Sequence, residues 1–211
     1  PVLKAIGEMQ LAPSHIDVGR LAVEFFDKAQ GEGMSLEEYI AQQLDFLVDS
    51  TQRPVEKPVD VVLYGFGRIG RLMARILINK TDGGDSLRLR AIVVRRGSAE
   101  NDLVKRASLL RRDSVHGAFQ GTIRVDEDRQ SFVANGNEIK VIYADRPEDV
   151  DYTAYGIDDC IVVDNTGVWR DDEALARHLE GKGVSKVILT APGKGQLKNI
   201  VAGINDHEIG P

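Results

Sequence analysis

From residue 59 onward, short apolar runs alternate with segments in which apolar residues recur every three or four positions. The runs predict buried strands, and the longer spacing predicts amphipathic helices. The expected strands are 59–64, 88–94, 139–143, 159–163, 186–190 and 200–204. The expected helices are 68–79, 100–111 and 171–180. Strands that alternate with helices indicate an α/β fold with a doubly wound parallel sheet.

One segment departs from this alternation. Residues 121–144 carry apolar and polar positions in turn, with Asn135-Gly136 in their midst. Asn-Gly is a strong signal for a tight hairpin turn. We therefore expect a small antiparallel excursion from the parallel sheet.

The first 57 residues differ in pattern from the rest. Apolar positions over 16–26 are spaced as in a helix, and Gly31-Glu-Gly33 interrupts them. Ser35 and Glu38 form a capping-box signature at the start of a second helix. We expect an N-terminal helical extension that leaves through the extended linker Arg53-Pro-Val-Glu-Lys-Pro58. Packing on the main domain is favoured over a dedicated partner-docking role.

The most informative motif follows the first strand. Val61-Val-Leu-Tyr leads into Gly65-Phe-Gly67-Arg-Ile-Gly70, and a helical pattern continues beyond it. Gly65 permits a tight turn, Gly67 lets the backbone approach a pyrophosphate, and Gly70 allows close packing of helix on strand. The N–H groups at the helix start can then bind the anion. We predict a Rossmann-type dinucleotide site within a domain over residues 58–211, after an extension over 1–57; a glycine turn that serves packing alone is the alternative.

Composition and charge narrow the class of protein. With 42% hydrophobic and 28% charged residues, the chain is typical of a soluble globular protein. Its net charge of −6 argues against nucleic acid or an anionic membrane as the main partner. We find no apolar run that could span a bilayer and no signal-type apolar core, so we expect a cytoplasmic protein. The single cysteine, Cys160, fits a reducing compartment and lies in a strand-like run, so we expect a buried structural thiol.

Four sequence islands occur in a fixed order. They are GFGRIGR (65–71), Asp113-Ser-Val-His-Gly-Ala-Phe119, Asn165-Thr-Gly-Val-Trp169, and Ile188-Leu-Thr-Ala-Pro192 with Ala202-Gly-Ile-Asn205. This ordered set resembles phosphorylating glyceraldehyde-3-phosphate dehydrogenase, which has a near-identical GFGRIGR and close counterparts of the others. The similarity covers about residues 59–209 and leaves the N-terminal helices unmatched.

The resemblance implies roles for several residues. Arg68 and Ile69 would present backbone N–H groups to the pyrophosphate of NAD or NADP. Thr166 and Gly167 would border the nicotinamide ribose, and Thr190 would line the pocket beside the nicotinamide. Hydrogen bonding to local backbone is the alternative for the two threonines.

The Asp113 island is harder to assign. We expect Asp113 and Ser114 to organise a loop, and His116 to be a hydrogen-bonded structural histidine rather than an acid or base. No residue of this chain is predicted to be catalytic or to bind a metal.

The first departure from the family concerns the adenosine ribose. Where the family ends its second strand with an aspartate, this chain reads Val93-Val-Arg95-Arg96-Gly97. An acidic residue accepts from the ribose 2′-OH, whereas arginine pairs with a 2′-phosphate, so NADP is slightly favoured over NAD. The predicted cofactor-binding residues are thus Gly65, Phe66, Gly67, Arg68, Ile69, Gly70, Arg95, Arg96, Thr166, Gly167 and Thr190.

The second departure concerns the nucleophile. In the family, a catalytic cysteine follows the Gly-Val-Asn island after about ten residues, whereas this sequence reaches Asn205 and stops at Pro211. We expect the chain to be the N-terminal part of a longer NAD(P)-dependent aldehyde-phosphate dehydrogenase, a homo-oligomer and by resemblance a tetramer, and to be inactive alone. The enzyme alternative is a dehydrogenase of erythrose 4-phosphate or another aldose phosphate. A non-catalytic nucleotide-binding module is the alternative of a different class.

Overall fold

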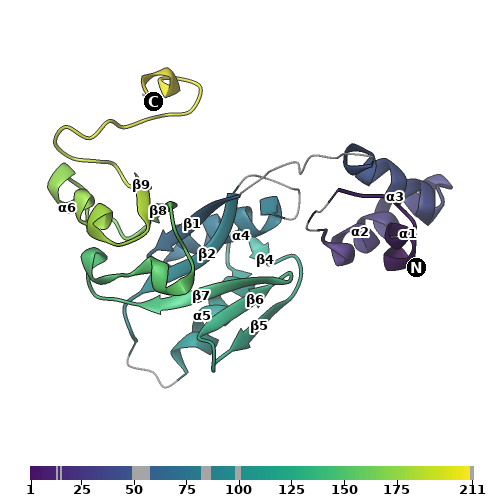
Figure 1. Cartoon of the computed structure of the whole chain (residues 1–211), viewed down its shortest axis with the longest axis horizontal. Coiled ribbons are helices and arrows are strands. Elements are labelled where there is room, and N and C mark those ends of the chain that lie inside the picture. Colours follow the sequence, from purple (N-terminus) through teal and green to yellow (C-terminus); the bar gives the residue numbers. More distant parts are fainter. Residues whose placement is uncertain (13, 15, 49–57, 82–86, 98–100, 210–211) are drawn as a thin grey trace.

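The computed structural model describes residues 1–209 except 13, 15, 49–57, 82–86 and 98–100. A seven-stranded sheet with the order β5-β6-β7-β2-β1-β8-β9 forms its centre (Figure 1). The strands are β1 (Val59–Tyr64), β2 (Leu87–Val94), β5 (Ile123–Asp126), β6 (Ser131–Ala134), β7 (Asn137–Tyr143), β8 (Cys160–Asp164) and β9 (Val184–Leu189). The helices of this region are α4 (Arg68–Thr81), α5 (Asp102–Arg111) and α6 (Asp172–Ala176), which a 3₁₀ turn (Arg177–Glu180) extends. The remaining strands, β3 (Arg112–Asp113) and β4 (Gly117–Ala118), form a separate two-stranded ladder.

Strand β1 lies in the middle of the parallel part of the sheet. It pairs in parallel with β2 on one side and with β8 on the other. The chain runs outward through β2 to β7 and then returns past β1 to form β8 and β9. The strand order therefore reverses between β1 and β8, and open α/β sheets bind ligands beyond the strand carboxyl ends at such a point. The predicted doubly wound parallel sheet is confirmed.

The predicted antiparallel excursion is also confirmed. Strands β5 and β6 pair antiparallel, and β6 pairs antiparallel with β7. Asn135 and Gly136 connect β6 to β7 with φ of 47° and 82°. Positive φ at both central residues is what a type I′ turn requires, and Asn and Gly tolerate it best.

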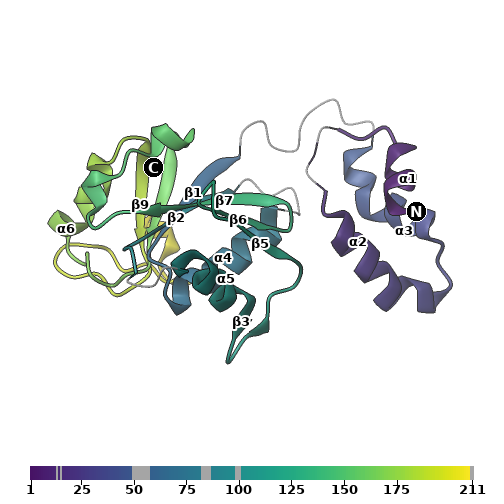
Figure 2. The same ribbon diagram turned by 90° about the horizontal axis from the view of Figure 1, so that it is seen from below.

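Alternating residues of β1 belong to two different cores. Val61 and Leu63 pack in one core with residues of α4 and α5, whereas Val62 and Tyr64 pack in the other with Tyr152. In Figure 2, α4 and α5 lie together on one side of the sheet. The near-continuous apolar run of β1 follows from this burial on both faces.

The N-terminal helices bury their apolar side chains against one another. They are α1 (Val2–Gly7), α2 (Val18–Glu24) with a short π and 3₁₀ continuation to Glu32, and α3 (Leu36–Leu44). Tyr39, Ile40, Leu44 and Leu47 pack in this separate core. The apolar face of these helices is thus buried within the extension and not on the main domain, contrary to the expectation. Contact between the two parts includes a hydrogen bond from Arg20 Nη1 to the carbonyl of Asn79 in α4, 3.5 Å.

The capping box predicted for the second of these helices is present. Ser35 Oγ accepts from the N–H of Glu38, and the Glu38 carboxylate accepts from the N–H of Ser35. These bonds lower the pKa of Glu38, because the carboxylate accepts from the backbone and the hydroxyl of Ser35. Most of the predicted linker lies outside the described residues.

The strand predicted over residues 200–204 is wrong. This segment consists of turns, in which the side chain of Asn205 accepts from the N–H of Val201 and the carbonyl of Val201 accepts from the N–H of Asn205. Gly203 has a φ of +78°, which interrupts extended backbone. An apolar run becomes a strand only where a neighbouring strand pairs with it, and here local turns take up the backbone groups.

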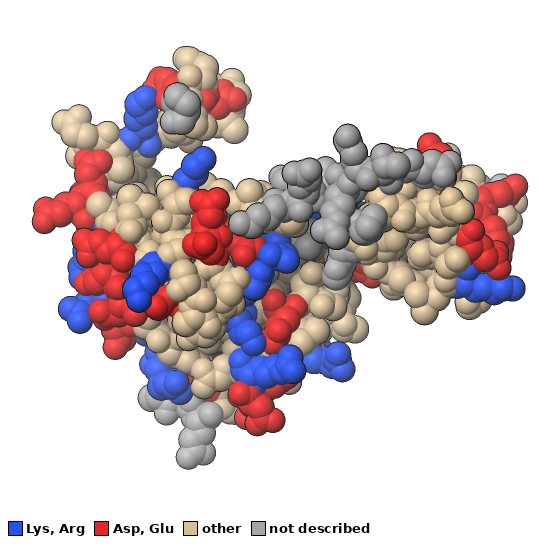
Figure 3. Space-filling model, in the orientation of Figure 1, with Lys and Arg blue, Asp and Glu red and all other residues tan. Residues whose placement is uncertain are grey.

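Two further observations concern the exterior. On the face drawn in Figure 3, acidic and basic side chains are interspersed over the sheet region. Among the residues that the structure describes, no helix is both long and apolar enough to cross a bilayer.

Candidate functional site

The turn after β1 is built around Gly65. Its φ is +91°, and its N–H donates to the carbonyl of Val93 in β2, 2.8 Å. A Cβ at this position would lie 2.8 Å from Cγ2 of Thr166, at the end of β8. Two features therefore require glycine at this position, namely the positive φ of its backbone and the close approach of the turn after β8.

The other two glycines of the motif have opposite surroundings. A Cβ on Gly70 would lie 2.4 Å from the carbonyl oxygen of Gly65, so α4 packs directly on the turn. Among the residues that the structure describes, none would lie within 4 Å of a Cβ on Gly67. Gly70 thus serves packing, whereas the backbone at Gly67 faces open space at the start of α4.

The amino end of α4 presents to this space backbone donors that lack a partner within the helix. The first intrahelical bond runs from the N–H of Arg71 to the carbonyl of Gly67, 3.0 Å. The N–H groups of Arg68, Ile69 and Gly70 precede that bond and have no partner within the helix. Together with the positive end of the helix dipole, they suit a pyrophosphate. Phe66 faces inward and packs near Phe132, with ring centroids 6.3 Å apart.

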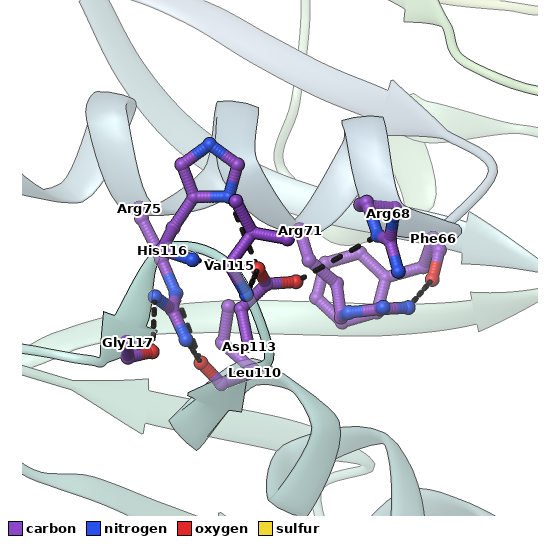
Figure 4. Close-up of polar contacts among 9 residues, drawn as sticks. All are labelled: Phe66, Arg68, Arg71, Arg75, Leu110, Asp113, Val115, His116 and Gly117. Atoms are coloured by element: carbon purple, nitrogen blue, oxygen red, sulfur yellow. Dashed lines mark hydrogen bonds and ion pairs between the residues drawn. The ribbon is translucent and has the colours of Figure 1, made fainter.

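The loop between α5 and β4 lies beside this helix end (Figure 4). Asp113 accepts from the N–H groups of Val115 and His116 and from the ring Nδ1 of His116, 3.0 Å. These bonds, the one from the His116 N–H foremost, hold the pKa of Asp113 well below its usual range. Asp113 Oδ2 also lies 3.9 Å from Nε of Arg68. The geometry agrees with a loop that Asp113 organises and that His116 joins by hydrogen bonding.

Arg75, a residue of α4, connects this helix to the loop by hydrogen bonds. Its Nη2 and Nε donate to the carbonyl of Leu110, 2.7 and 3.1 Å, and its Nη1 donates to the carbonyl of Gly117, 3.0 Å (Figure 4). One buried guanidinium therefore joins α4, the end of α5 and β4.

Asp164 stands at the carboxyl end of β8 and organises the next turn. Its Oδ1 accepts from both the N–H and the hydroxyl of Thr166, each 2.7 Å. Its Oδ2 lies 2.9 Å from Nε2 of His178, and both side chains are fully buried. Gly167 follows in the left-handed region, with φ of +66°. Hydrogen bonds to a buried carboxylate thus stabilise the turn that follows β8.

Thr190, which follows the end of β9, hydrogen-bonds to the turn that Asp164 organises. Its N–H and its hydroxyl both lie 3.0 Å from the carbonyl oxygen of Asp164, to which each donates. Asn165, the residue after Asp164, donates its N–H to the carbonyl of Tyr64 at the end of β1, 2.8 Å. Burial, and next the charge of Asp164, raise the pKa of Tyr64 to about 12. The ends of β1, β8 and β9 are therefore linked at one edge.

Arg95 and Arg96 follow the end of β2, one strand further from β8, and both are exposed. The Arg96 guanidinium lies over the Tyr143 ring, 4.2 Å from its centroid, and the Tyr143 hydroxyl donates to Asp102, 3.0 Å. The carbonyl of Arg95 accepts from Arg106, 2.9 Å, whereas its guanidinium makes no hydrogen bond or ion pair among the described residues.

The sequence reading missed Asp164, His178, Tyr143 and Asp102 as parts of this edge. An acidic residue that closes an apolar strand, as Asp164 does in Cys-Ile-Val-Val-Asp, is a signal that could have pointed to the first. The contacts of the other three join distant segments and leave no local pattern.

Cys160 lies at the opposite end of β8 from this edge. Its side chain is buried, and burial raises the pKa of its thiol to about 11. Such a thiol is protonated at neutral pH and closed to solvent, which agrees with the structural role expected for it.

Comparisons with known proteins bear on the same region. The sequence model of the family described as "Glyceraldehyde 3-phosphate dehydrogenase, NAD binding domain" matches residues 59–172. A glyceraldehyde-3-phosphate dehydrogenase-like protein of Pseudomonas aeruginosa is 57% identical over 210 residues, which cover 100% of this chain and 45% of that protein.

Two further relatives match the α/β region. A glyceraldehyde-3-phosphate dehydrogenase of Streptococcus pyogenes is 37% identical over 151 residues, 72% of this chain and 41% of that protein. One of Thermotoga maritima is 36% identical over 154 residues, 72% of this chain and 42% of that protein. The chain spans less than half the length of each of these three relatives.

Proposed function

This chain belongs to the glyceraldehyde-3-phosphate dehydrogenase family, and we propose that residues 58–211 bind the nicotinamide dinucleotide of such a dehydrogenase. The proposed reaction converts an aldehyde phosphate and inorganic phosphate into an acyl phosphate. When bound, the dinucleotide supplies the hydride acceptor. The residues of this chain bind and orient it.

The β1–α4 turn carries this proposal. Gly65 makes the turn, Gly70 brings α4 against it, and the open space at Gly67 lies before N–H groups that have no partner within the helix. A dinucleotide pyrophosphate fits this donor set, because it is an anion that accepts several hydrogen bonds at once. The turn also stands where the strand order reverses, beside Thr166.

The other proposed contacts lie along the same edge. Arg68 and Ile69 donate backbone N–H groups to the pyrophosphate, with Phe66 packed beneath the turn. Thr166, Gly167 and Thr190 border the nicotinamide end.

For the cofactor we favour NADP slightly over NAD. The guanidinium of Arg95 makes no hydrogen bond or ion pair with the residues that the structure describes, and arginine can pair with a 2′-phosphate. Arg96 stacks on Tyr143, and we propose that it contacts the adenine side. Neither residue supplies the carboxylate that accepts from a free 2′-OH.

Several wider features extend the proposal. The parent is a cytoplasmic homo-oligomer, by resemblance a tetramer, and the lone Cys160 suits a reducing compartment. The chain divides into a helical extension at 1–57 and the dinucleotide domain at 58–211, in line with their separate cores. The 211-residue chain is inactive by itself, because Cys160 is buried away from the site.

Two alternatives remain distinguishable. An aldose-phosphate dehydrogenase that uses erythrose 4-phosphate would share this cofactor site. A non-catalytic nucleotide-binding module would also bind dinucleotide, but its longer protein would show no phosphate-dependent oxidation of any aldehyde phosphate.

Calorimetric titration of the 211-residue chain with NAD and with NADP tests the proposal. Gly67→Ala places a methyl group in the open space and should weaken binding roughly tenfold, the loss of about one charge-assisted hydrogen bond. Gly7→Ala is the matched control, since a Cβ there also meets nothing within 4 Å but lies in α1. Absence of binding by the unmodified chain, or equal affinities of both variants, would contradict the proposal.

A further inference from the structure

A fully buried acid–histidine pair stands directly behind the edge of the sheet. Asp164 and His178 have no exposed side-chain surface, and their Oδ2 and Nε2 atoms are 2.9 Å apart. A carboxylate can only accept, so Nε2 of the histidine carries the hydrogen. The other ring nitrogen, Nδ1, is buried and has no partner among the described residues.

A buried pair of this kind contributes little to the stability of the fold. Removing two polar groups from water costs free energy that their attraction barely returns, and apolar residues often replace a buried pair without loss. The orphaned Nδ1 adds to that cost. The edge-on contact of the His178 ring with Tyr64, at 4.7 Å between centroids, fixes the imidazole in place rather than satisfying this nitrogen.

What the pair controls is the hydroxyl of Thr166. That hydroxyl donates its single hydrogen to Asp164 Oδ1, 2.7 Å, and accepts from the N–H of Val168, 3.1 Å. A hydroxyl has one hydrogen and two lone pairs, so one lone pair is left. The exposed Thr166 oxygen can therefore only accept a hydrogen bond from a ligand.

Thr190 has the same polarity. Its hydroxyl donates to the carbonyl of Asp164, 3.0 Å, or to Oδ1 of Asn165, 3.2 Å. With its hydrogen thus committed, it too presents lone pairs at the edge. Each of the two hydroxyls can thus accept from a ligand that donates from hydroxyl groups.

We propose that Asp164, held by His178, is a positioning residue that fixes Thr166 as an acceptor for a ribose hydroxyl of the bound dinucleotide. This rests on the proposed function for the identity of the ligand. The fixed orientation of Thr166 is itself a property of the free chain. His178 holds the carboxylate so that its other oxygen faces both donors of Thr166.

The test uses the 211-residue chain in three variants. Asp164→Val/His178→Phe replaces the whole pair by apolar groups, so the fold persists while Thr166 loses its acceptor. Asp164→Asn keeps the shape but offers a neutral oxygen, a weaker acceptor than a carboxylate. Asp60→Asn is the matched control, because Asp60 is a buried carboxylate at the other end of the sheet, paired with Arg88 and Arg90.

Two readouts are measured, namely NAD affinity by calorimetry and hydrogen exchange of the Thr166 and Val168 amides. We expect the double variant to remain folded, to bind NAD roughly tenfold more weakly and to exchange both amides faster. Asp164→Asn should fall between it and the unmodified chain, whereas Asp60→Asn should change neither readout.

The results can contradict the positioning role of Asp164 in two ways. Unchanged exchange of both amides in a folded double variant, or equal effects of Asp164→Asn and Asp60→Asn, would overturn the positioning role. If the double variant does not fold, the comparison of the two asparagine variants stands in its place. If the unmodified chain binds no NAD, the proposed function fails, while the exchange data still answer whether Asp164 fixes Thr166.

Discussion

Gly65 and Gly70 touch so closely that no side chain fits between them. A Cβ on Gly70 would lie 2.4 Å from the carbonyl oxygen of Gly65. Helix α4 thus begins in direct contact with the turn that precedes it.

Gly70→Ala should therefore lower the free energy of unfolding by about 1–3 kcal/mol, as other overpacked cores do. Gly67→Ala should leave it within about 0.5 kcal/mol, because the new methyl group has no atom of the described residues within 4 Å. Urea denaturation of the two variants measures both. Equal stabilities would mean that α4 can shift away from the turn.

Arg95→Ala should weaken NADP binding roughly tenfold and leave NAD binding nearly unchanged, because a charge-assisted contact to the 2′-phosphate is lost. Arg96→Ala should weaken both cofactors alike, since its guanidinium stacks on Tyr143. Titration of each variant with both dinucleotides separates the two effects. Equal NAD and NADP affinities in the unmodified chain, unaltered by Arg95→Ala, would show that Arg95 does not read the cofactor.

Asp113 should make the chain sensitive to acid. Its pKa is lowered in the folded state, so its contribution to stability is full above its unfolded pKa of about 4 and declines as the pH falls towards the lowered value. Asp113→Asn, which keeps an oxygen for the N–H groups of Val115 and His116, removes the charge alone. The stability difference between the two proteins, measured by denaturation from pH 7 to pH 2, should shrink below pH 4. A constant difference would contradict this role.

Cys160 should resist thiol reagents in the folded chain. With its pKa raised to about 11, only about a thousandth of the thiol is ionised at pH 8, and the side chain is buried. Labelling with iodoacetamide at pH 8 should proceed only as fast as the protein unfolds. Rapid modification under native conditions would show that β8 opens at this end.

Removal of residues 1–57 should leave the melting temperature of the remainder within a few degrees, because the extension has its own core. Arg20→Ala in the full chain is the control, since Arg20 donates to Asn79 of α4. Thermal unfolding followed by circular dichroism compares the three proteins. A large fall on truncation would show that the extension supports the sheet.

Much of the fold could be read from consecutive residues. The apolar run of β1, the Asn135-Gly136 turn and the Ser35–Glu38 capping box each act within a few positions of the chain. The three glycines of the β1–α4 turn were likewise predictable, because their spacing is set by local backbone geometry. The turn itself therefore needed no knowledge of distant residues.

The sequence did not predict which surface or strand an apolar segment packs against. The run over 200–204 has strand-like composition but no strand beside it, and local turns hold its backbone groups. The apolar face that includes Leu44 and Leu47 had to be buried, but its periodicity did not say against what. Burial follows from composition, whereas the covering surface depends on how the chain folds back.

The sequence by itself determined the β1–α4 turn and the order of the elements; the tertiary structure decided which side chains complete the candidate site. Asp164 and His178 are 14 residues apart and lie on different elements, yet they meet behind Thr166. Tyr143 and Asp102 meet across 41 residues. Local conformation is set by neighbours in sequence, but a hydrogen bond between buried side chains forms only when packing of the whole sheet brings donor and acceptor within about 3 Å.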